Sequence, residues 1–233
     1  MKSMNKLIKI VSVLAVLTGF SITPLMADSS DFAGAYVGIT GSAIGVELDG
    51  KHVNAGGDDA GADTTTGVIG RVAGIAGAEV GYALPVSDTM LIDIGANYYS
   101  GAAKISTTSD DSSSTADVTF EMSDLITAYI APTFAVSDTA SIYVKIGVME
   151  ADTKTTGDVT QPADLSGTLI GIGSRSLLGN GMFMRTEACM IDFDSISVKG
   201  KGAGGTGKTV ATTSTVSADP LVAYGSISIG YKF

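Results

Sequence analysis

From residue 28 onward, apolar and polar side chains alternate with a period of two in one segment after another. In the C-terminal segment, Phe233, Tyr231, Ile229, Ile227, Gly225, Ala223 and Leu221 share one face, opposite Lys232, Gly230, Ser228, Ser226 and Tyr224. The same alternation runs through residues 72–82, 90–99, 126–134 and 140–148. Residues 165–178 alternate poorly, because Ser174 and Ser176 fall on the apolar side. This period predicts β-strands with one face in an apolar environment.

Two kinds of connection alternate between these segments. The short ones are Pro85–Thr89, Ala135–Thr139 and Gly179–Gly181, of which the last contains Asn-Gly, a strong hairpin signal. The long ones, rich in Gly, Ser, Thr and Asp and without periodicity of their own, are residues 47–66, 105–117, 152–164 and 199–218. Three short and four long connections join eight strands. They predict an all-β fold, an eight-stranded antiparallel up-and-down transmembrane β-barrel with short periplasmic turns.

The width of the apolar face decides between lipid and water outside the barrel. Counted from each short turn, the first outward charge comes after ten residues, at Asp124, Glu150 and Asp192. Ten residues of a tilted strand rise about 25 Å, which is the height of an outer-membrane apolar band. Aromatic side chains mark its margins: Tyr82, Phe134, Tyr231 and Phe233 on the turn side, and Tyr98 on the other. A secreted lipocalin-like barrel would instead carry polar side chains outside and apolar ones inside.

The first 27 residues have the pattern of a secretory signal peptide. Lys2, Lys6 and Lys9 precede an apolar run, and Pro24 and Ala27 follow it, which predicts cleavage after Ala27 and a mature barrel of residues 28–233. An uncleaved single-span anchor is the alternative. Cleavage removes three lysines and no acids, so the mature chain carries 11 basic and 24 acidic side chains, a net charge of −13. That acidity argues against nucleic acid as a partner.

Composition excludes two other classes. Hydrophobic residues make up 45% of the chain, which argues against a disordered tail. The 30 glycines argue against a helical bundle, and no second segment approaches the ~20 apolar residues of a membrane-spanning helix.

Both ends of the mature chain resemble a known family. The C-terminal Tyr231-Lys-Phe233 is similar to the terminal signal of bacterial outer-membrane proteins, and Asp31–Gly38 resembles the start of the opacity-protein-like outer-membrane β-barrel domain. OmpA and OmpW share this architecture. The resemblance implies location in the outer membrane of a diderm bacterium, among lipid and lipopolysaccharide. It also implies delivery to the barrel-assembly machinery through Tyr231 and Phe233.

The inward face of the predicted strands carries nine charged residues of nearly balanced sign. They are Arg71, Glu79, Asp93, Glu121, Lys145, Arg175, Arg185, Glu187 and Lys232. Charges removed from water must pair, which favours a salt-bridged plug that fixes the barrel. The alternative is a gated ion path, with room for water beside Gly77, Gly95, Gly147, Gly171, Gly173 and Gly230.

Other chemical motifs carry less weight. Gly202–Thr209 matches a nucleotide-binding P-loop, but a β-prone segment follows it where a helix is needed. His52 is the only histidine and has no serine or acid beside it in one strand, and Cys189 is expected to be buried. The loop acids, which lack the spacing of a dedicated cation site, are Asp58, Asp59, Asp63, Asp110 and Asp111. We expect no enzyme, cofactor or metal site.

The leading functional hypothesis is therefore an integral outer-membrane barrel with a structural and surface role, whose long polar loops face outside. A narrow porin-like channel for ions or small solutes is the alternative. A third possibility is an adhesin or ligand-binding surface antigen, although the loops have few apolar or aromatic anchors.

Overall fold

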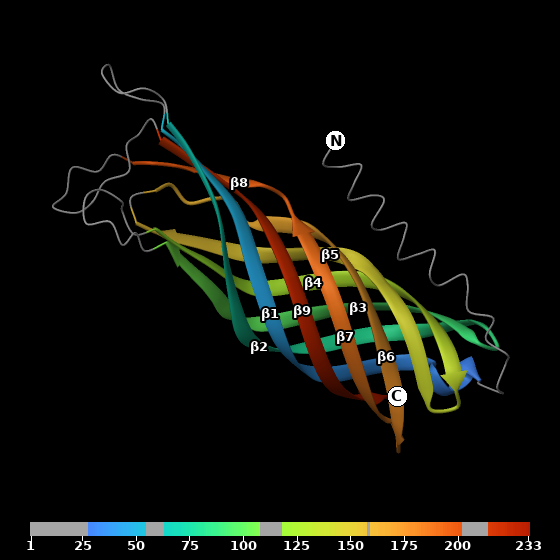
Figure 1. The fold of residues 1–233 in the computed structure, drawn as a ribbon. Helices are drawn as coiled ribbons and strands as arrows, with labels where there is room; N and C mark the ends of the chain where they lie inside the picture. The colour runs from blue at the N-terminus through green and yellow to red at the C-terminus, as the bar shows by residue number, and fades with distance from the viewer. Residues whose placement is uncertain (1–27, 55–62, 108–117, 158, 202–213) are drawn as a thin grey trace.

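The computed structural model describes residues 28–54, 63–107, 118–157, 159–201 and 214–233. The predicted signal peptide lies outside these residues. A short 3₁₀ helix and nine strands follow one another along the chain (Figure 1): η1 (Ser29–Phe32), β1 (Gly34–Asn54), β2 (Asp63–Ser87), β3 (Met90–Thr107), β4 (Val118–Ser137), β5 (Ala140–Thr156), β6 (Leu165–Gly179), β7 (Met182–Phe193), β8 (Ile196–Lys199) and β9 (Ser214–Lys232).

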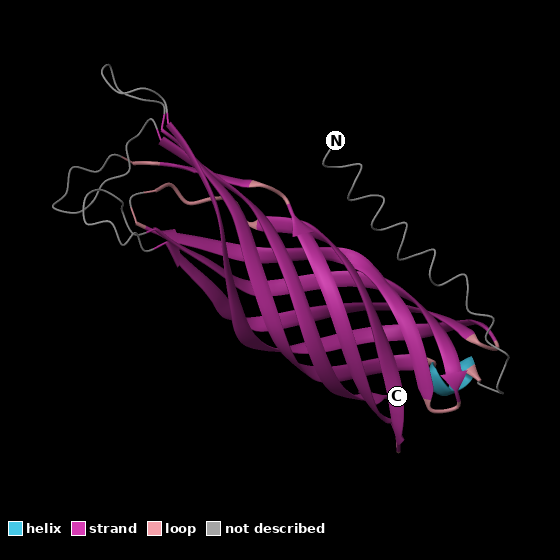
Figure 2. Ribbon diagram, viewed as in Figure 1, coloured by secondary structure: helices cyan, strands magenta, loops and turns pink. Residues whose placement is uncertain are grey.

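The strands close into an eight-stranded antiparallel barrel (Figure 2), as predicted. From β1 to β7 each strand pairs with its neighbours in sequence, β7 pairs with β9, and β1 pairs with β9 to complete the ring. The short β8 also pairs with β9, and it follows β7 after a break at Asp194 and Ser195. Together β7 and β8 occupy the position of one strand in the ring.

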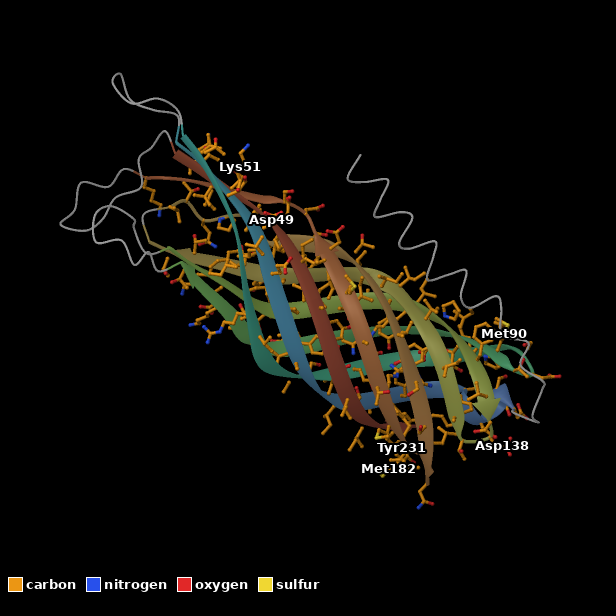
Figure 3. All side chains as sticks on the ribbon, in the orientation of Figure 1. Asp49, Lys51, Met90, Asp138, Met182 and Tyr231 are labelled. Carbon is orange, nitrogen blue, oxygen red and sulfur yellow. The ribbon has the colours of Figure 1, made fainter. Side chains whose placement is uncertain are left out.

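Tight hairpins gather at one end of the barrel. Asn180 and Gly181 both have positive φ, 52° and 78°, which a two-residue hairpin with a type I′ turn requires. The other two short turns are at residues 88–89 and 138–139. Figure 3 shows Met90, Asp138 and Met182 at this end, and Asp49 and Lys51 at the opposite one. We call the first the turn end and the second the loop end.

The outer surface has the predicted apolar band. The outward side chains of β2, β4 and β9 are mostly exposed aliphatic residues, such as Val80, Ile130 and Ile227. At the upper margin, the Tyr98 hydroxyl donates to Asp124 Oδ1 at 2.6 Å, so an aromatic side chain meets the first outward charge. No helix of the described residues is long and apolar enough to cross a membrane.

The strands continue further toward the loop end than the sequence pattern predicted. Residues 47–54, 63–66, 105–107, 152–156 and 214–218 were expected in loops and belong to β1, β2, β3, β5 and β9. In this extension the alternation persists with its sense inverted: Val46 and Leu48 are buried inside, while Glu47 and Asp49 are exposed outside. The prediction failed because it equated the end of the outer apolar band with the end of the strands.

Candidate functional site

Six of the nine predicted interior charges meet inside the barrel and are each at most 7% exposed. We call them the ion-pair layer: Glu79, Asp93, Lys145, Arg175, Arg185 and Glu187. They come from β2, β3, β5, β6 and β7, and their three positive and three negative side chains balance. Full burial of six charges is tolerated only when each has an opposite partner.

Arg185 is the centre of this layer. Its Nη1 lies 2.9 Å from Glu79 Oε2, and its Nη2 lies 2.9 Å from Asp93 Oδ2. Arg175 stands directly opposite Arg185 on the neighbouring strand, and it also pairs with Asp93. Two like charges at opposed positions would repel. The Asp93 carboxylate between them removes that repulsion.

The third cation forms a separate ion pair in the layer. Lys145 Nζ lies 2.9 Å from Glu187 Oε2, and it also donates to Asn97 Oδ1 at 3.2 Å. The Tyr143 hydroxyl donates to Glu187 Oε1 at 2.8 Å. Each charge in this pair is therefore held by a neutral side chain as well as by its opposite.

Tyrosines link the parts of the layer, and the sequence analysis did not identify them. Arg185 Nη1 donates to the Tyr129 hydroxyl at 2.9 Å, which lies 2.8 Å from the Tyr36 hydroxyl. Tyr36 in turn donates to Asp93 Oδ1 at 2.5 Å, so the chain of hydrogen bonds returns to a partner of Arg185. The rings also lie against the cations: Lys145 Nζ is 3.9 Å from the centre of the Tyr129 ring. Such closed networks hold their members in one arrangement.

The glycines that were predicted to leave room for water are covered by side chains. A Cβ added at any of the six would come within 3 Å of a neighbouring side chain, from Tyr99, Tyr129, Cys189, Tyr143 or Phe183. Most of these residues sit directly across from the glycine on the adjacent strand, as Tyr129 does from Gly95 and Gly147. Five of the six glycines make space for a large inward aromatic residue and Gly171 makes space for Cys189, so none of them faces open space.

Three of the nine predicted members lie outside the layer. Arg71 follows the inward alternation but is exposed, because it sits in the extension toward the loop end. Lys232 is at the rim of the turn end, where its Nζ donates to the Asp31 carbonyl oxygen at 2.5 Å. Glu121 points outward and pairs with Lys104 at 3.0 Å, with 25% of its side chain exposed.

A bulge explains the error at Glu121. Asp124 has a φ of 49°, and the β4–β5 register shifts between Ser123 and Ile126. On the turn-end side of this bulge the buried residues of β4 are odd-numbered, such as Leu125. On the loop-end side they are even-numbered, such as Met122. One extra residue reverses the faces of the strand.

Above the ion-pair layer, toward the loop end, the interior is mostly apolar. Its cluster includes Leu169, Ile191 and Val222, each 0% exposed, together with Phe120 and Met149. The side chains of an eight-stranded barrel are large enough to fill its interior. This apolar core and the ion-pair layer are stacked along the barrel axis.

The N-terminal segment covers the interior at the turn end. Phe32 is fully buried against Ala83, Leu91 and Ala135, and its carbonyl oxygen accepts from Arg175 Nη1 at 3.5 Å. The Ser29 hydroxyl donates to the Ser87 carbonyl oxygen at 2.6 Å, which ties the segment to the first hairpin.

Asp28 begins this segment, directly after the predicted cleavage position. It caps η1: the Ser30 N–H donates to Asp28 Oδ1 at 2.8 Å, and this hydrogen bond lowers the pKa of the carboxyl group. The first residue of the predicted mature chain thus has a defined place in the fold.

The remaining sequence candidates give no site within the described residues. Cys189 is buried, as predicted. Residues 202–209, the side chain of His52 and the side chains of the five loop acids lie outside what the structure describes. In the described part of the chain, no three His, Cys, Asp or Glu side chains are grouped to hold a metal ion.

Comparison with known proteins supports the fold. No protein-family model and no curated protein matches the chain. Among solved structures, the outer membrane protein OprG from Pseudomonas aeruginosa is 17% identical, with a TM-score of 0.50, covering 86% of this chain and 96% of that one. Ail of Yersinia pestis is 11% identical over 86% and 99%, with a TM-score of 0.40. The protease OmpT from Escherichia coli is 7% identical over 92% and 99%, with a TM-score of 0.44.

Identities this low show the fold alone. The chain has the fold of outer-membrane β-barrels, which is the architecture that the resemblance to the opacity-protein-like, OmpA and OmpW group implied. The outer-membrane location predicted from the sequence agrees with this fold and with the apolar band on its surface.

Proposed function

We propose that this chain is an outer-membrane barrel with a sealed interior and a structural and surface role, exposing the loop end to the medium. The observation that carries the proposal is the balanced ion-pair layer: three cations and three carboxylates from five strands, each at most 7% exposed and each paired. Such a layer ties the strands together and leaves none of its charges facing a water-filled path.

Two further features support a sealed interior over a channel. Aromatic rings and Cys189 cover the six glycines of the suggested ion path. Phe32 covers the turn end, and the apolar core fills the loop end. An ion on this route would have to pass Phe32 on one side of the ion-pair layer and the apolar core on the other, where few polar groups could replace its water.

The proposed surroundings follow from the outer face. Lipid would surround the apolar band, with lipopolysaccharide at its upper margin beside Tyr98. The rings of Tyr231 and Phe233 point outward, 46% and 74% exposed, which leaves them available to the barrel-assembly machinery. Export with cleavage after Ala27 would start the mature chain at the cap of η1. The absence of enzymatic activity stays a prediction, because a protease is among the similar folds.

Substitution of Lys145 separates a sealed barrel from a channel. Lys145→Met leaves Glu187 buried with only Tyr143 as a partner. A sealed barrel predicts a lower unfolding temperature in detergent micelles and an unchanged leak across lipid vesicles. Lys104→Met, which breaks an exposed ion pair, is the matched control and should change neither. An altered conductance or ion preference in Lys145→Met, with the protein still folded, would favour the channel.

A further inference from the structure

The barrel wall lacks pairing between β2 and β3 toward the loop end. β2 pairs with β1 up to Asp63, but its pairing with β3 ends at Ala76 and Ser100. Beyond that point β3 continues to Thr107, and among the described residues it pairs there with β4 alone. Figure 1 shows that toward the loop end β2 stays beside β1 while β3 stays beside β4, and the two pairs diverge. Within the described residues, one edge of β2 from Thr64 to Ile75 is therefore unpaired.

A glycine marks the point of separation. Gly101 has a φ of 127°, and the β3–β4 register shifts between Tyr99 and Ala102. A Cβ at Gly101 would lie 3.0 Å from Ile75 Cγ2, so the two strands still touch there. At this irregularity β3 bends so that it stays paired with β4. Beyond the contact with Ile75 the edge of β2 is therefore left unpaired.

The unpaired edge has little of the usual protection. Natural edge strands carry lysines, prolines, bulges or inward-pointing charges that hinder another strand from adding to them, and of these residues 64–75 have only Arg71. Residues 64–75 are Thr-Thr-Thr-Gly-Val-Ile-Gly-Arg-Val-Ala-Gly-Ile, with β-branched residues at seven positions, no proline and one charge. Val68 and Val72 on the outer face are 65% and 74% exposed. This composition favours pairing with an additional strand.

The inner face of the same edge specifies what could pair there. Ile69 and Ala73 are partly buried against the apolar core. Arg71 lies between them on that face, is exposed, and has the apolar Val46 as its β1 neighbour. Side chains directly opposite each other in adjacent strands interact, and opposite charges there attract. The edge therefore presents an apolar–basic–apolar series.

We propose that residues 64–75 of β2 dock an extended peptide segment of a partner protein, which adds to the barrel wall as an antiparallel strand. The segment has an acidic residue opposite Arg71 and apolar residues two positions to either side, which lie over Ile69 and Ala73. Main-chain hydrogen bonds supply affinity, and the alternate side chains supply specificity. The inference rests on the surface role proposed above, since it needs the loop end to be outside the membrane.

A short synthetic peptide tests the side-chain part of this inference. The probe is fluorescently labelled Thr-Ile-Thr-Glu-Thr-Ile-Thr with blocked ends, titrated against the folded full chain in detergent micelles, with empty micelles as the blank. We expect saturable binding that weakens about three- to tenfold when the central Glu is replaced by Lys. Arg71→Glu should reverse this preference, whereas Lys104→Glu on the outer wall should leave it unchanged. Equal binding of both peptides to the unsubstituted chain would overturn the inference.

Main-chain pairing is tested separately. N-methylation at the alternate peptide residues that face β2 should abolish binding, while N-methylation at the other alternate residues should not. Edge amides of residues 64–75 should exchange quickly in the free chain and slowly with peptide bound. Protection of those amides in the peptide-free chain would show that the edge is already covered, by this chain or by a second copy, and would contradict the proposal. A conducting barrel that binds the peptide would refute the sealed interior and leave this inference intact.

Discussion

The two halves of this barrel have opposite chemistry on the same strands. On β7, the inward residues Arg185 and Glu187 near the turn end carry charge, whereas Ile191 further along is fully buried in an apolar core. The outward residues change in the other direction, from exposed Met184 and Met190 to the acids that follow. Period-two alternation is continuous through the change, but its sense inverts.

This comparison shows that period-two alternation indicates a strand with two different faces. The surroundings of the barrel then determine which of the two faces is apolar. Where lipid surrounds the barrel, apolar side chains face out and the polar ones must satisfy one another inside. Where water surrounds it, the same strand buries its apolar side chains inward. The turn-end half is thus organised as a membrane barrel, and the loop-end extension as a water-soluble one.

The two interiors should respond to different kinds of damage. An ion pair depends on the identity of its partner, because removing one side leaves an uncompensated buried charge. An apolar core depends on volume and tolerates swaps that conserve it. The following substitutions separate these two behaviours.

Arg185→Ala should have the largest effect. It leaves Glu79 and Asp93 without their central cation, and we expect a loss of about 3–5 kcal/mol in the free energy of unfolding. Arg185→Lys should not restore stability, because an ammonium group cannot span Glu79, Asp93 and Tyr129 together. Urea unfolding in micelles measures both. Arg71→Ala is the control, expected to change stability by less than about 0.5 kcal/mol.

Leu169→Ala probes the apolar core. This side chain is 0% exposed, and its truncation should cost about 2–4 kcal/mol because it leaves a cavity. Leu169→Met conserves most of the volume and should cost less than about 1.5 kcal/mol. If the methionine variant were as unstable as the alanine variant in the same urea titration, the volume argument for this half would be wrong.

Phe32→Ala should have a smaller effect on global stability, about 1 kcal/mol. The η1 segment can leave the turn end while the strands stay paired, so the loss appears mainly as local opening. Hydrogen exchange of the Ser29 and Ala33 amides should become faster than in the unsubstituted chain. Unchanged exchange there would mean that Phe32 does not hold the segment in place.

Lys104→Ala should have the smallest effect. It removes an ion pair whose nitrogen–oxygen distance is similar to those of the pairs inside the barrel, but 56% of the Lys104 side chain is exposed. Exposed pairs contribute at most about 1 kcal/mol, and salt screens them. The urea midpoint should move little, and raising the salt concentration should remove the difference. A loss comparable to that of Arg185→Ala would contradict the distinction between buried and exposed pairs.

Much of the fold follows from local sequence signals. The alternation, the Asn180-Gly181 turn and the ten-residue spacing to the first outward charge each depend on neighbours in sequence, so the strands and their number could be predicted. The same alternation of inward and outward positions placed Glu79, Asp93 and Lys145 inside the barrel. An odd or even position in the strand gives the face on which a residue lies, but not its height along the barrel axis. For this reason Arg71 and Lys232, which lie near the ends of the barrel, were included among the predicted interior charges.

The rest depends on contacts between distant strands. The bulge at Asp124 reverses a face, and no sequence signal in its segment marks it. Tyr36, Tyr129 and Tyr143 could have been suspected from inward glycines, since a large ring across from a glycine fills the space that it leaves. The unpaired edge of β2 arises because its pairing with β3 ends before the strand does. The alternation of residues along β2 alone does not reveal where that pairing ends.

The central claim is that complementary polar and apolar layers seal the barrel. The most direct test is the current across a planar lipid bilayer that contains the refolded chain of residues 28–233, after a gel has shown that the unboiled protein migrates as a folded band. The account predicts a silent bilayer at all applied voltages. Discrete, reproducible openings from the folded protein would contradict it.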